Sequence, residues 1–461
     1  MGLQVFAIVL ALVLLMAFAY RGLPVIIFAP IFALLAAGLS GRPLLPSYTE
    51  SFMGSAADYV KAFFPIFLLG AIFGKLMETS GAAGSIAARI VGALGAGRAI
   101  LAVVLSCAAL TYGGVSLFVV AFAVYPLAAV LFREADIPKR LIPGAIALGA
   151  FTFTMDALPG SPQIQNLIPT RYFGTDAYAA PIVGTAGGTV IFVLGMLWLE
   201  HRRRSARAAG EGYGEGHRNE PDGGPGDRHP HLILAVLPLL VVLGASYVLS
   251  RSALSVATWY PEEALRSTYP TLAVKAVVSS WALIVALVLG IAVTILVHAP
   301  RVWGRLTPSL SLATSGALLA IFNTASEVGF GNVIKTMPGF RAIQGWVLGA
   351  SRYPLVSEAV AVNVLAGITG SASGGLSIAL DVMGKHYLEL AEAQGISPDL
   401  LHRIASMASG GMDTLPHNGA VITLLSITGL THRQSYPDIF AITLIKTATV
   451  FALALAVSLA L

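Results

Sequence analysis

Long apolar segments with few charges constrain this chain more than any other feature of its sequence. Residues 3–19 and 23–39 are almost entirely apolar, and residues 99–132 form a single apolar tract. Only 11% of the residues are charged, whereas a soluble domain has about a quarter. The apolar runs are long and unbroken, unlike the ~10-residue alternating segments of a membrane β-barrel. The sequence therefore predicts an all-α polytopic membrane protein, with the lipid bilayer as its surroundings.

Charge and cysteine usage exclude several other classes of protein. The net charge is +5, and most basic residues stand beside apolar segments, so we interpret them as topology signals and expect no nucleic-acid partner. Cys107 is the only cysteine, which excludes a disulfide within the chain and a cysteine metal site. No nucleophile–base pair or metal cluster is recognisable, so we expect no enzyme activity, no catalytic residue, no metal and no cofactor.

A charged motif occurs twice inside apolar text. Asp156 begins Asp-Ala-Leu-Pro and Asp413 begins Asp-Thr-Leu-Pro, 257 positions later. An offset of 257 or 258 also relates Gly74 to Gly331, Thr79 to Thr336 and Thr111 to Thr369. A charge followed by a proline interrupts a membrane helix. We therefore predict two matched broken helices in two internal repeats.

Each repeat reads as a span, a short apolar hairpin with a Gly/Ser/Thr tip, and a helix broken at Asp-x-Leu-Pro. Two straight crossings need ~40 residues at ~1.5 Å per residue, so each hairpin is too short to cross twice and is predicted to be re-entrant. Basic residues at 202–204, 301 and 305 mark cytoplasmic loops. This topology gives ten full crossings and two re-entrant hairpins. It makes the repeats inverted and places both termini outside.

We divide the chain into six segments. They are a two-span scaffold at 1–54; repeat 1 with its closing span at 55–200, with tip 111–116 and broken helix 141–170; a cytoplasmic linker at 201–230; two connecting spans at 231–310; repeat 2 at 311–428, with tip 369–375 and broken helix 402–427; and a final span at 429–461. The linker is rich in glycine and charge, a composition typical of flexible linkers.

Inverted repeats with broken helices are typical of secondary transporters that bind substrate near the membrane midplane. Amides at a half-helix N-terminus attract anions, and glycines allow close approach of the backbone to a ligand. The predicted substrate-binding residues are Thr111, Gly113, Gly114, Ser116, Asp156, Ser161, Asn166, Asn323, Thr369, Ser371, Ser373, Gly374 and Asn418. The predicted coupling-ion residues are Asp413, His417 and Glu327, because carboxylates and histidine exchange protons.

Each of these residues also has a purely structural interpretation. The two aspartates fit the helix-cap pattern, in which Asp precedes a helix and proline follows within its first turn. Glu327 has possible buried partners in Lys335 and Arg341. The tips fit close packing of small residues between helices, and His417 fits a simple hydrogen-bond partner.

Three stretches carry a resemblance to a known family: Phe73-Gly74-Lys75-Leu76-Met77, residues 368–375 (Ile-Thr-Gly-Ser-Ala-Ser-Gly-Gly) and residues 413–423 (Asp-Thr-Leu-Pro-His-Asn-Gly-Ala-Val-Ile-Thr). They resemble the gluconate permease family of the ion transporter superfamily. The third stretch is similar to the branch associated with short hydroxy acids such as 3-hydroxybutyrate.

The resemblance implies a proton-coupled symporter of a small organic anion in the bacterial inner membrane, with a scaffold domain, a mobile transport domain and a homodimeric assembly. The residues leave three alternatives open. A sodium-coupled carboxylate carrier of the same fold would hold Na⁺ with carbonyl, Asn, Ser and Thr oxygens. A receptor or membrane-embedded enzyme would need no symmetric site. A channel would need no alternating access.

Overall fold

The structure is a computed structural model. It describes residues 2–21, 23–115, 117–220, 230–251, 253–260, 262–270, 272, 274–340, 345, 351–369, 371–416 and 418–460. These residues form helices joined by turns and loops, and no strand occurs among them. Within the described part, six helices are long and apolar enough to cross a membrane. The predicted all-helical polytopic fold class is confirmed.

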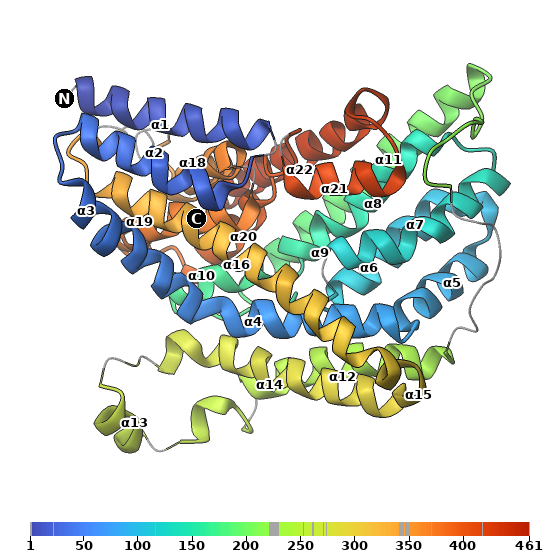
Figure 1. Ribbon diagram of the computed structural model, residues 1–461, viewed down its shortest axis with the longest axis horizontal. Coiled ribbons are helices and arrows are strands. Elements are labelled where there is room, and N and C mark those ends of the chain that lie inside the picture. Colours follow the sequence, from blue (N-terminus) through green and yellow to red (C-terminus); the bar gives the residue numbers. More distant parts are fainter. Residues whose placement is uncertain are drawn as a thin grey trace.

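The N-terminal helices pack along one edge of the molecule (Figure 1). Helix α1 (Gly2–Tyr20) pairs with α2 (Val25–Leu39), and α2 lies against α16 (Leu306–Lys335). Their buried side chains form a hydrophobic cluster separate from the main core. The rings of Phe18, Phe28 and Phe32 contact one another inside it. This edge is therefore a distinct apolar unit that packs on the beginning of repeat 2.

Repeat 1 follows the predicted order of elements. Helix α3 (Leu44–Pro46) and a π-helical turn, η1 (Ser47–Phe52), lead into α4. The repeat then comprises α4 (Met53–Thr79), α5 (Ala82–Leu94), hairpin α6 (Ala99–Tyr112) and α7 (Leu117–Glu134), broken helix α8 (Ile142–Ala150), α9 (Phe153–Asp156) and α10 (Ile164–Phe173), and α11 (Pro181–Ala208).

Two apolar helices connect the repeats. Helices α12 (Leu232–Arg251) and α14 (Val274–Val297) pack together along the edge opposite α1 and α2, with the short helix α13 (Glu262–Thr268) between them in sequence (Figure 1). Helix α14 also contacts α4. The short helix α15 (Ala299–Val302) then turns the chain toward α16.

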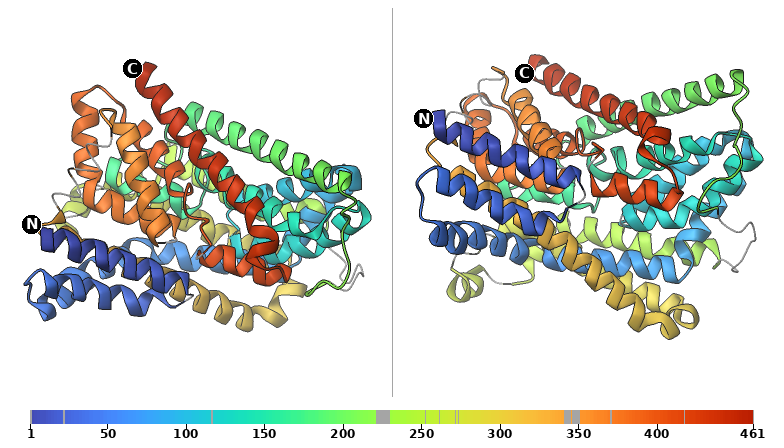
Figure 2. Two further views of the ribbon diagram at one scale, coloured as in Figure 1. Left: turned by 90° about the horizontal axis from the view of Figure 1, so that it is seen from above. Right: turned by 45° about the horizontal axis from the view of Figure 1, so that its top comes forward.

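Repeat 2 has the same element order. It comprises α16, hairpin α18 (Pro354–Thr369) and α19 (Ala372–Ala393), broken helix α20 (Pro398–Ser409) and α21 (Gly419–Thr428), and the final helix α22 (His432–Ala460). The first helices of the two repeats, α4 and α16, pack against each other. The closing helices α11 and α22 also pack together (Figure 2).

The second half of each broken helix packs on the other repeat. Helix α10 lies against α19 and α20, and α21 lies against α7 and α8. Neither repeat therefore has a hydrophobic core of its own, because a half-helix of each repeat packs into the core of the other. This exchange brings the two breaks into one region of the molecule.

The hairpin lengths agree with the predicted turns at their tips. At ~1.5 Å per residue, α6 and α18 are roughly 21 and 24 Å long, shorter than a ~30 Å hydrocarbon core. Helix α19 is longer, at 22 residues. Its last turns carry Lys385, His386, Glu389 and Glu392, so the extra length is polar.

The first break is wider than predicted. We placed it at 156–161, but α8 already ends at Ala150, and α9 is a separate short helix. Thr152 donates its hydroxyl to the Leu148 carbonyl at 2.5 Å, and Thr154 donates to Gly149 at 2.7 Å. These side chains replace backbone amides as partners of the last turn, which ends the helix.

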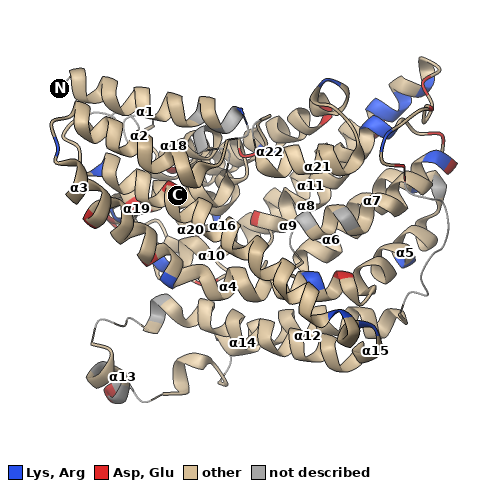
Figure 3. Cartoon of the chain, viewed as in Figure 1, with Lys and Arg blue, Asp and Glu red and all other residues tan. Residues whose placement is uncertain are grey.

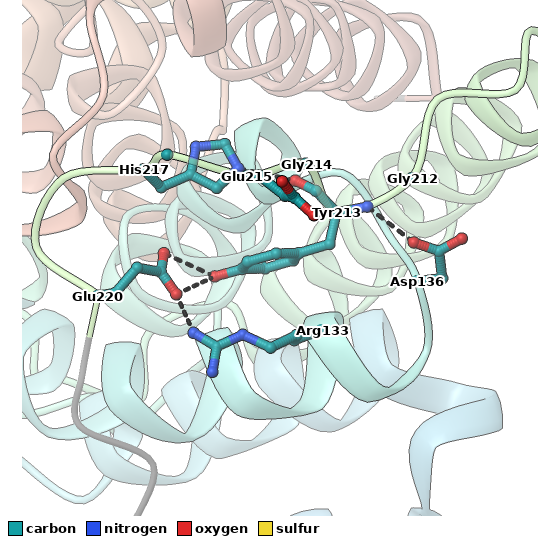
Figure 4. Close-up of a pocket in the computed structure, with 9 residues that line it drawn as sticks. Arg133, Asp136, Gly212, Tyr213, Gly214, Glu215, His217 and Glu220 are labelled. Atoms are coloured by element: carbon teal, nitrogen blue, oxygen red, sulfur yellow. Dashed lines mark hydrogen bonds and ion pairs between the residues drawn. The ribbon is translucent and has the colours of Figure 1, made fainter.

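The linker is also more ordered than its composition suggests. Helix α11 continues to Ala208, and residues 209–220 fold back onto α7. Figure 4 shows the Tyr213 hydroxyl pointing at the Glu220 carboxylate, which also pairs with Arg133. The Tyr213 amide donates to Asp136 at 2.9 Å. Ion pairs therefore hold part of the segment that glycine content alone would leave flexible.

Most charged residues lie toward helix ends rather than in the middle of the long apolar helices (Figure 3). Eight charged side chains among the described residues are almost wholly buried. Lys139 forms an ion pair with Glu220, and Asp438 forms ion pairs with Arg140 and Arg202. The other six are Asp156, Glu327, Glu358, Arg403, Asp413 and Lys446. Charges at such depth need partners or a function. They define the candidate site.

Candidate functional site

The tip of the first hairpin rests directly on the first break. The Tyr112 hydroxyl donates to the Pro159 carbonyl at 2.8 Å. The Gln163 amide donates to the Thr111 carbonyl at 2.8 Å, which satisfies the C-terminal end of α6. Gly114 has φ +93°, and a side chain there would press on Pro162. The predicted tip residues Thr111, Gly113 and Gly114 therefore lie beside the break.

Arg403 of α20 braces the same break from the other repeat. Its guanidinium is fully buried and donates to the carbonyls of Asp156, Ala177 and Ala179, at distances between 2.8 and 3.3 Å. It also donates to the Asn166 side chain at 2.8 Å. Free carbonyls at a helix break in a membrane need donors, and one arginine supplies several here.

Two of the predicted substrate-binding residues form hydrogen bonds with the protein backbone around the first break. The Ser161 hydroxyl donates to the Thr154 carbonyl at 2.7 Å. The Asn166 amide donates to the Ser161 and Ala177 carbonyls at 2.9 and 2.8 Å. Both side chains thus shape the backbone of the first break. Their predicted contact with substrate remains a prediction.

The two repeated aspartates meet around a lysine. Lys446 of α22 forms an ion pair with Asp156, and its ammonium also donates to the Phe151 carbonyl at 3.0 Å. A methyl group at Gly410 would collide with the Lys446 ammonium and the Asp156 carboxylate, and Asp413 stands three residues after Gly410. All three side chains are at most 6% exposed. A cation and two carboxylates, one from each break, therefore share one desolvated region.

The second break approaches this cluster through glycine. A methyl group at Gly410 would collide with the Lys446 ammonium and the Asp156 carboxylate. A methyl group at Gly411 would collide with the Asn363 side chain of α18. The backbone of the second break thus lies against the Lys446–Asp156 pair at Gly410 and against Asn363 at Gly411.

Asp413 is only partly satisfied. Its Oδ1 atom is buried and has no hydrogen-bond partner among the residues that the structure describes. The same is true of both amide atoms of Asn363. Buried polar atoms of this kind indicate a place where a ligand or proton binds.

The second hairpin tip faces Glu327. A methyl group at Gly374 would collide with the Glu327 carboxylate, and the Gly374 amide donates to the Ser371 hydroxyl at 3.1 Å. The hydroxyls of Ser371 and Ser373 are 3.4 Å apart. The predicted residues Glu327, Ser371, Ser373 and Gly374 therefore form one polar group. Lys335, a suggested partner of Glu327, instead pairs with Asp381.

The remaining predicted residues have other positions. Asn418 caps α21, accepting from the amides of Ala420 and Val421 at 2.6 and 3.1 Å. Asn323, near the middle of α16, accepts from the Ile26 amide of α2 at 3.3 Å. Ser116 and His417, and the side chain of Thr369, lie outside the described residues. The structure therefore does not place these last three predictions.

The buried polar residues that sequence reasoning missed include Lys446, Arg403, Glu358 and Asn363. Lys446 had a clear signal, because it stands alone in the apolar part of the last span, and a charge there usually has a function. Glu358 and Asn363 stand inside an apolar hairpin limb and carried the same signal. Arg403 had a weaker one, because it follows a helix start at Ser397 and looked peripheral.

Comparisons with known proteins agree with the architecture. The model of the family described as GntP family permease matches residues 2–289, more than half of the chain. This chain belongs to the GntP permease family. It is also similar to the protein named "Uncharacterized transporter YxjC" of Bacillus subtilis (strain 168), at 52% identity over 97% of this chain and 98% of the relative.

Two solved transporter structures share the fold of this GntP permease. One is the YdaH transporter of Alcanivorax borkumensis, with TM-score 0.54, 16% identity, and coverage of 90% of this chain and 88% of that one. The other is MtrF of Neisseria gonorrhoeae, described among antimetabolite efflux pumps, with TM-score 0.50, 12% identity, and coverage of 88% and 83%. At these identities the likeness concerns the fold only. The predicted family is confirmed: the chain is a multi-pass membrane transporter and not an enzyme.

Proposed function

We propose that this permease is a proton-coupled symporter of a small hydroxy-monocarboxylate such as 3-hydroxybutyrate or gluconate. The observation that carries the proposal is the buried Lys446–Asp156 ion pair at the first break, against which the second break lies at Gly410, three residues before Asp413. A buried ammonium suits a carboxylate substrate. A carboxylate with a free oxygen beside it suits a coupling proton.

The second hairpin tip supports the same proposal. Glu327 is buried against Gly374, and its Oε2 has no hydrogen-bond partner among the described residues. Ser371 and Ser373 offer hydroxyls at the N-terminus of α19, where backbone amides favour an anion. Glu327, Asp413 and His417 remain our candidates for the coupling proton, and the two tips for substrate contacts.

The membrane arrangement is part of the proposal. We place the linker in the cytoplasm of a bacterial inner membrane, both termini outside, the repeats in inverted orientation, and two copies in a homodimer. Single cysteines introduced at residues 215 and 263 of a Cys107→Ala variant would test the orientation. A membrane-impermeant maleimide should label residue 263 in right-side-out vesicles and residue 215 in inverted vesicles. The opposite labelling contradicts this topology.

Uptake into proteoliposomes tests the function. An inward proton gradient should drive accumulation of labelled 3-hydroxybutyrate or gluconate above the external concentration, and a sodium gradient at equal pH should not. Accumulation driven by sodium alone would favour the sodium-coupled carrier. A thermal-shift panel of hydroxybutyrate, lactate, gluconate, glycerate, D-serine and citrate selects the anion for this assay.

Asp413→Asn tests the coupling assignment. The variant should still exchange internal for external anion, because exchange moves no net proton, but it should lose accumulation. Concentrative uptake by this variant would show that Asp413 does not carry the proton. Glu327→Gln is the parallel test for the second tip.

A further inference from the structure

Lys446 of α22 is a buried cation that lies at the first break. Its ammonium contacts the Asp156 carboxylate and the Phe151 carbonyl. The Phe151 carbonyl follows the end of α8. Lys446 therefore links α22 to the first break, while Gly410 brings the second break against the same ammonium.

The net charge of the residues around Lys446 restricts which ligands this site can bind. Arg403 faces Asp156 from α20, and it acts electrostatically on that carboxylate. With both aspartates ionised, the charges of Lys446, Arg403, Asp156 and Asp413 balance. A proton on Asp413 leaves one excess positive charge, and an anion without a proton leaves one excess negative charge. Either excess is costly in a desolvated site.

Other titratable groups lie on the elements that carry these residues or pack against them. His402 of α20 contacts the Thr175 hydroxyl at 2.6 Å and Asn166 at 3.3 Å. Asp438 of α22 lies two turns from Lys446 and pairs with Arg140 and Arg202. On α18, Glu358 is buried, and neither of its carboxylate oxygens has a hydrogen-bond partner among the described residues. His417 adjoins the second break but lies outside the described residues.

We propose that Lys446 binds the carboxylate of the transported anion, and that a proton on Asp413 makes the ammonium available for it. One proton then enters with one monovalent anion, because only that combination keeps the site neutral. Proton and anion strengthen each other's binding by the same factor. This inference takes the chemical class of the anion from the proposed function and adds the binding group and a one-to-one stoichiometry.

Asn363 supplies the second contact for a hydroxy acid. Its amide touches the backbone of Gly411, while Lys446 touches that of Gly410. Successive Cα atoms are ~3.8 Å apart, so the two polar groups flank neighbouring residues of the second break. Both Asn363 amide atoms lack a hydrogen-bond partner within the described part of the chain. We assign Asn363 to the substrate hydroxyl and Lys446 to the carboxylate.

Infrared spectroscopy of the ligand-free protein tests the charge balance without any substrate. At neutral pH, Lys446→Gln should gain intensity in the carboxylic-acid C=O band, because the two aspartates lose a cation. Lys446→Gln combined with Asp413→Asn should lose that gain. Lys335→Gln, which also removes a lysine paired with an aspartate, should leave the band unchanged. An unchanged band in Lys446→Gln overturns the shared-cation assignment.

Ligand binding tests the role of the ammonium. The thermal stabilisation of purified protein by 3-hydroxybutyrate should give a Kd at least ~10-fold weaker in Lys446→Gln, and near wild-type in Lys446→Arg. Asp413→Asn should bind with an affinity that no longer changes between pH 5 and 8. Unchanged affinity in Lys446→Gln contradicts carboxylate binding by Lys446. If the Lys446→Gln variant is not monodisperse, the double variant Lys446→Gln with Asp156→Asn replaces it, because it removes both members of the ion pair. The same loss of affinity for 3-hydroxybutyrate is expected.

Asn363→Leu tests the hydroxyl contact. It should reduce the preference for 3-hydroxybutyrate over butyrate by roughly 10-fold, the effect of one lost hydrogen bond. An unchanged preference removes Asn363 from the substrate site.

These tests separate failure of the inference from failure of the proposed function. A gain of the infrared band with no stabilisation by any hydroxy acid would refute the proposed substrate and retain the shared cation. If 3-hydroxybutyrate stabilises the wild-type protein and the Lys446→Gln variant equally, the proposed substrate is retained and the role of Lys446 is refuted.

Discussion

The two breaks have the same sequence pattern but different degrees of internal support. In the first break, Arg403, Asn166 and Ser161 hold backbone carbonyls, and Tyr112 fixes Pro159. In the second break, Asn418 caps α21. Asp413 Oδ1 and both amide atoms of Asn363 lack partners among the described residues.

This difference predicts separate roles for the two breaks. Free backbone groups in a membrane must be satisfied by protein or by ligand. The backbone carbonyls of the first break accept hydrogen bonds from protein side chains, so this backbone is suited to be a rigid wall. The Thr111 hydroxyl at the adjacent tip has no partner among the described residues. The second break keeps polar atoms free for a ligand. We therefore expect mutations in the first break to alter stability and mutations in the second to alter binding and coupling.

The largest effect should come from Arg403→Met. It removes the donor that several buried carbonyls share, and loss of one side of a buried charged network costs about 3–5 kcal/mol. Asn418→Ala, in the second break, should cost only about 1 kcal/mol, the usual value for a helix cap. Denaturant unfolding in mixed micelles measures both. Equal costs would remove the proposed contrast between the breaks.

The paired aspartates should differ next. Asp156→Asn leaves Lys446 buried without its carboxylate and should lower the free energy of unfolding by about 3 kcal/mol. Asp413→Asn should change it by less than about 1 kcal/mol, because Oδ1 has no partner in the described part of the chain. Unfolding curves compare the two. A larger loss in Asp413→Asn would place the principal ion pair on the second repeat.

The serines test the same contrast on a smaller scale. Ser161→Ala removes a hydroxyl that serves the Thr154 carbonyl and should cost about 1–2 kcal/mol of stability without changing KM. The double change of Ser371 and Ser373 to Ala should raise KM roughly 2- to 10-fold, with little change in unfolding. Uptake kinetics and unfolding of the same preparations decide this. An unchanged KM in the double variant would remove the second tip from the site.

The smallest effect concerns the linker, outside the membrane. The Arg140 guanidinium, which hydrogen-bonds Glu211 at 2.6 and 2.7 Å, holds the pKa of that carboxyl below its ordinary value. A lowered folded-state pKa gives stability that is present above the ordinary value of 4.5 and is lost as the pH falls through the folded value. The pair is partly exposed, so its contribution is below about 1 kcal/mol.

Glu211→Gln should therefore destabilise the protein slightly above pH 4.5 and not at lower pH. Thermal unfolding as a function of pH measures the difference, with the exposed linker residue Glu215→Gln as the control. An identical effect at all pH values would show that the contact does not depend on the carboxylate charge.

Several features were predictable from local sequence. The length of the apolar runs predicted the helices, because a bilayer allows helical spans and little else. Proline and glycine predicted the breaks, and the 257-residue offset predicted the matched order of elements. The family resemblance also followed from short motifs, as the comparison with GntP permeases confirmed.

Other features arose only from tertiary packing. Whether a buried serine or asparagine serves backbone or ligand depends on the neighbouring carbonyls, and those belong to distant segments. Asn166 and Arg403 are 237 positions apart. The extended first break followed from threonine side chains that bond back to α8, a local competition that helix patterns do not reveal.

The sequence alone determined that this chain is a helical membrane protein with two repeated, broken helices, since hydropathy and backbone geometry act locally. The tertiary structure alone decided that one lysine pairs with the first aspartate and also lies against the backbone that leads to the second. Lys446 follows the second motif along the chain but pairs with the first, 290 positions away. Such a pairing depends on the way each repeat packs its half-helix on the other, and local sequence contains no information about that exchange.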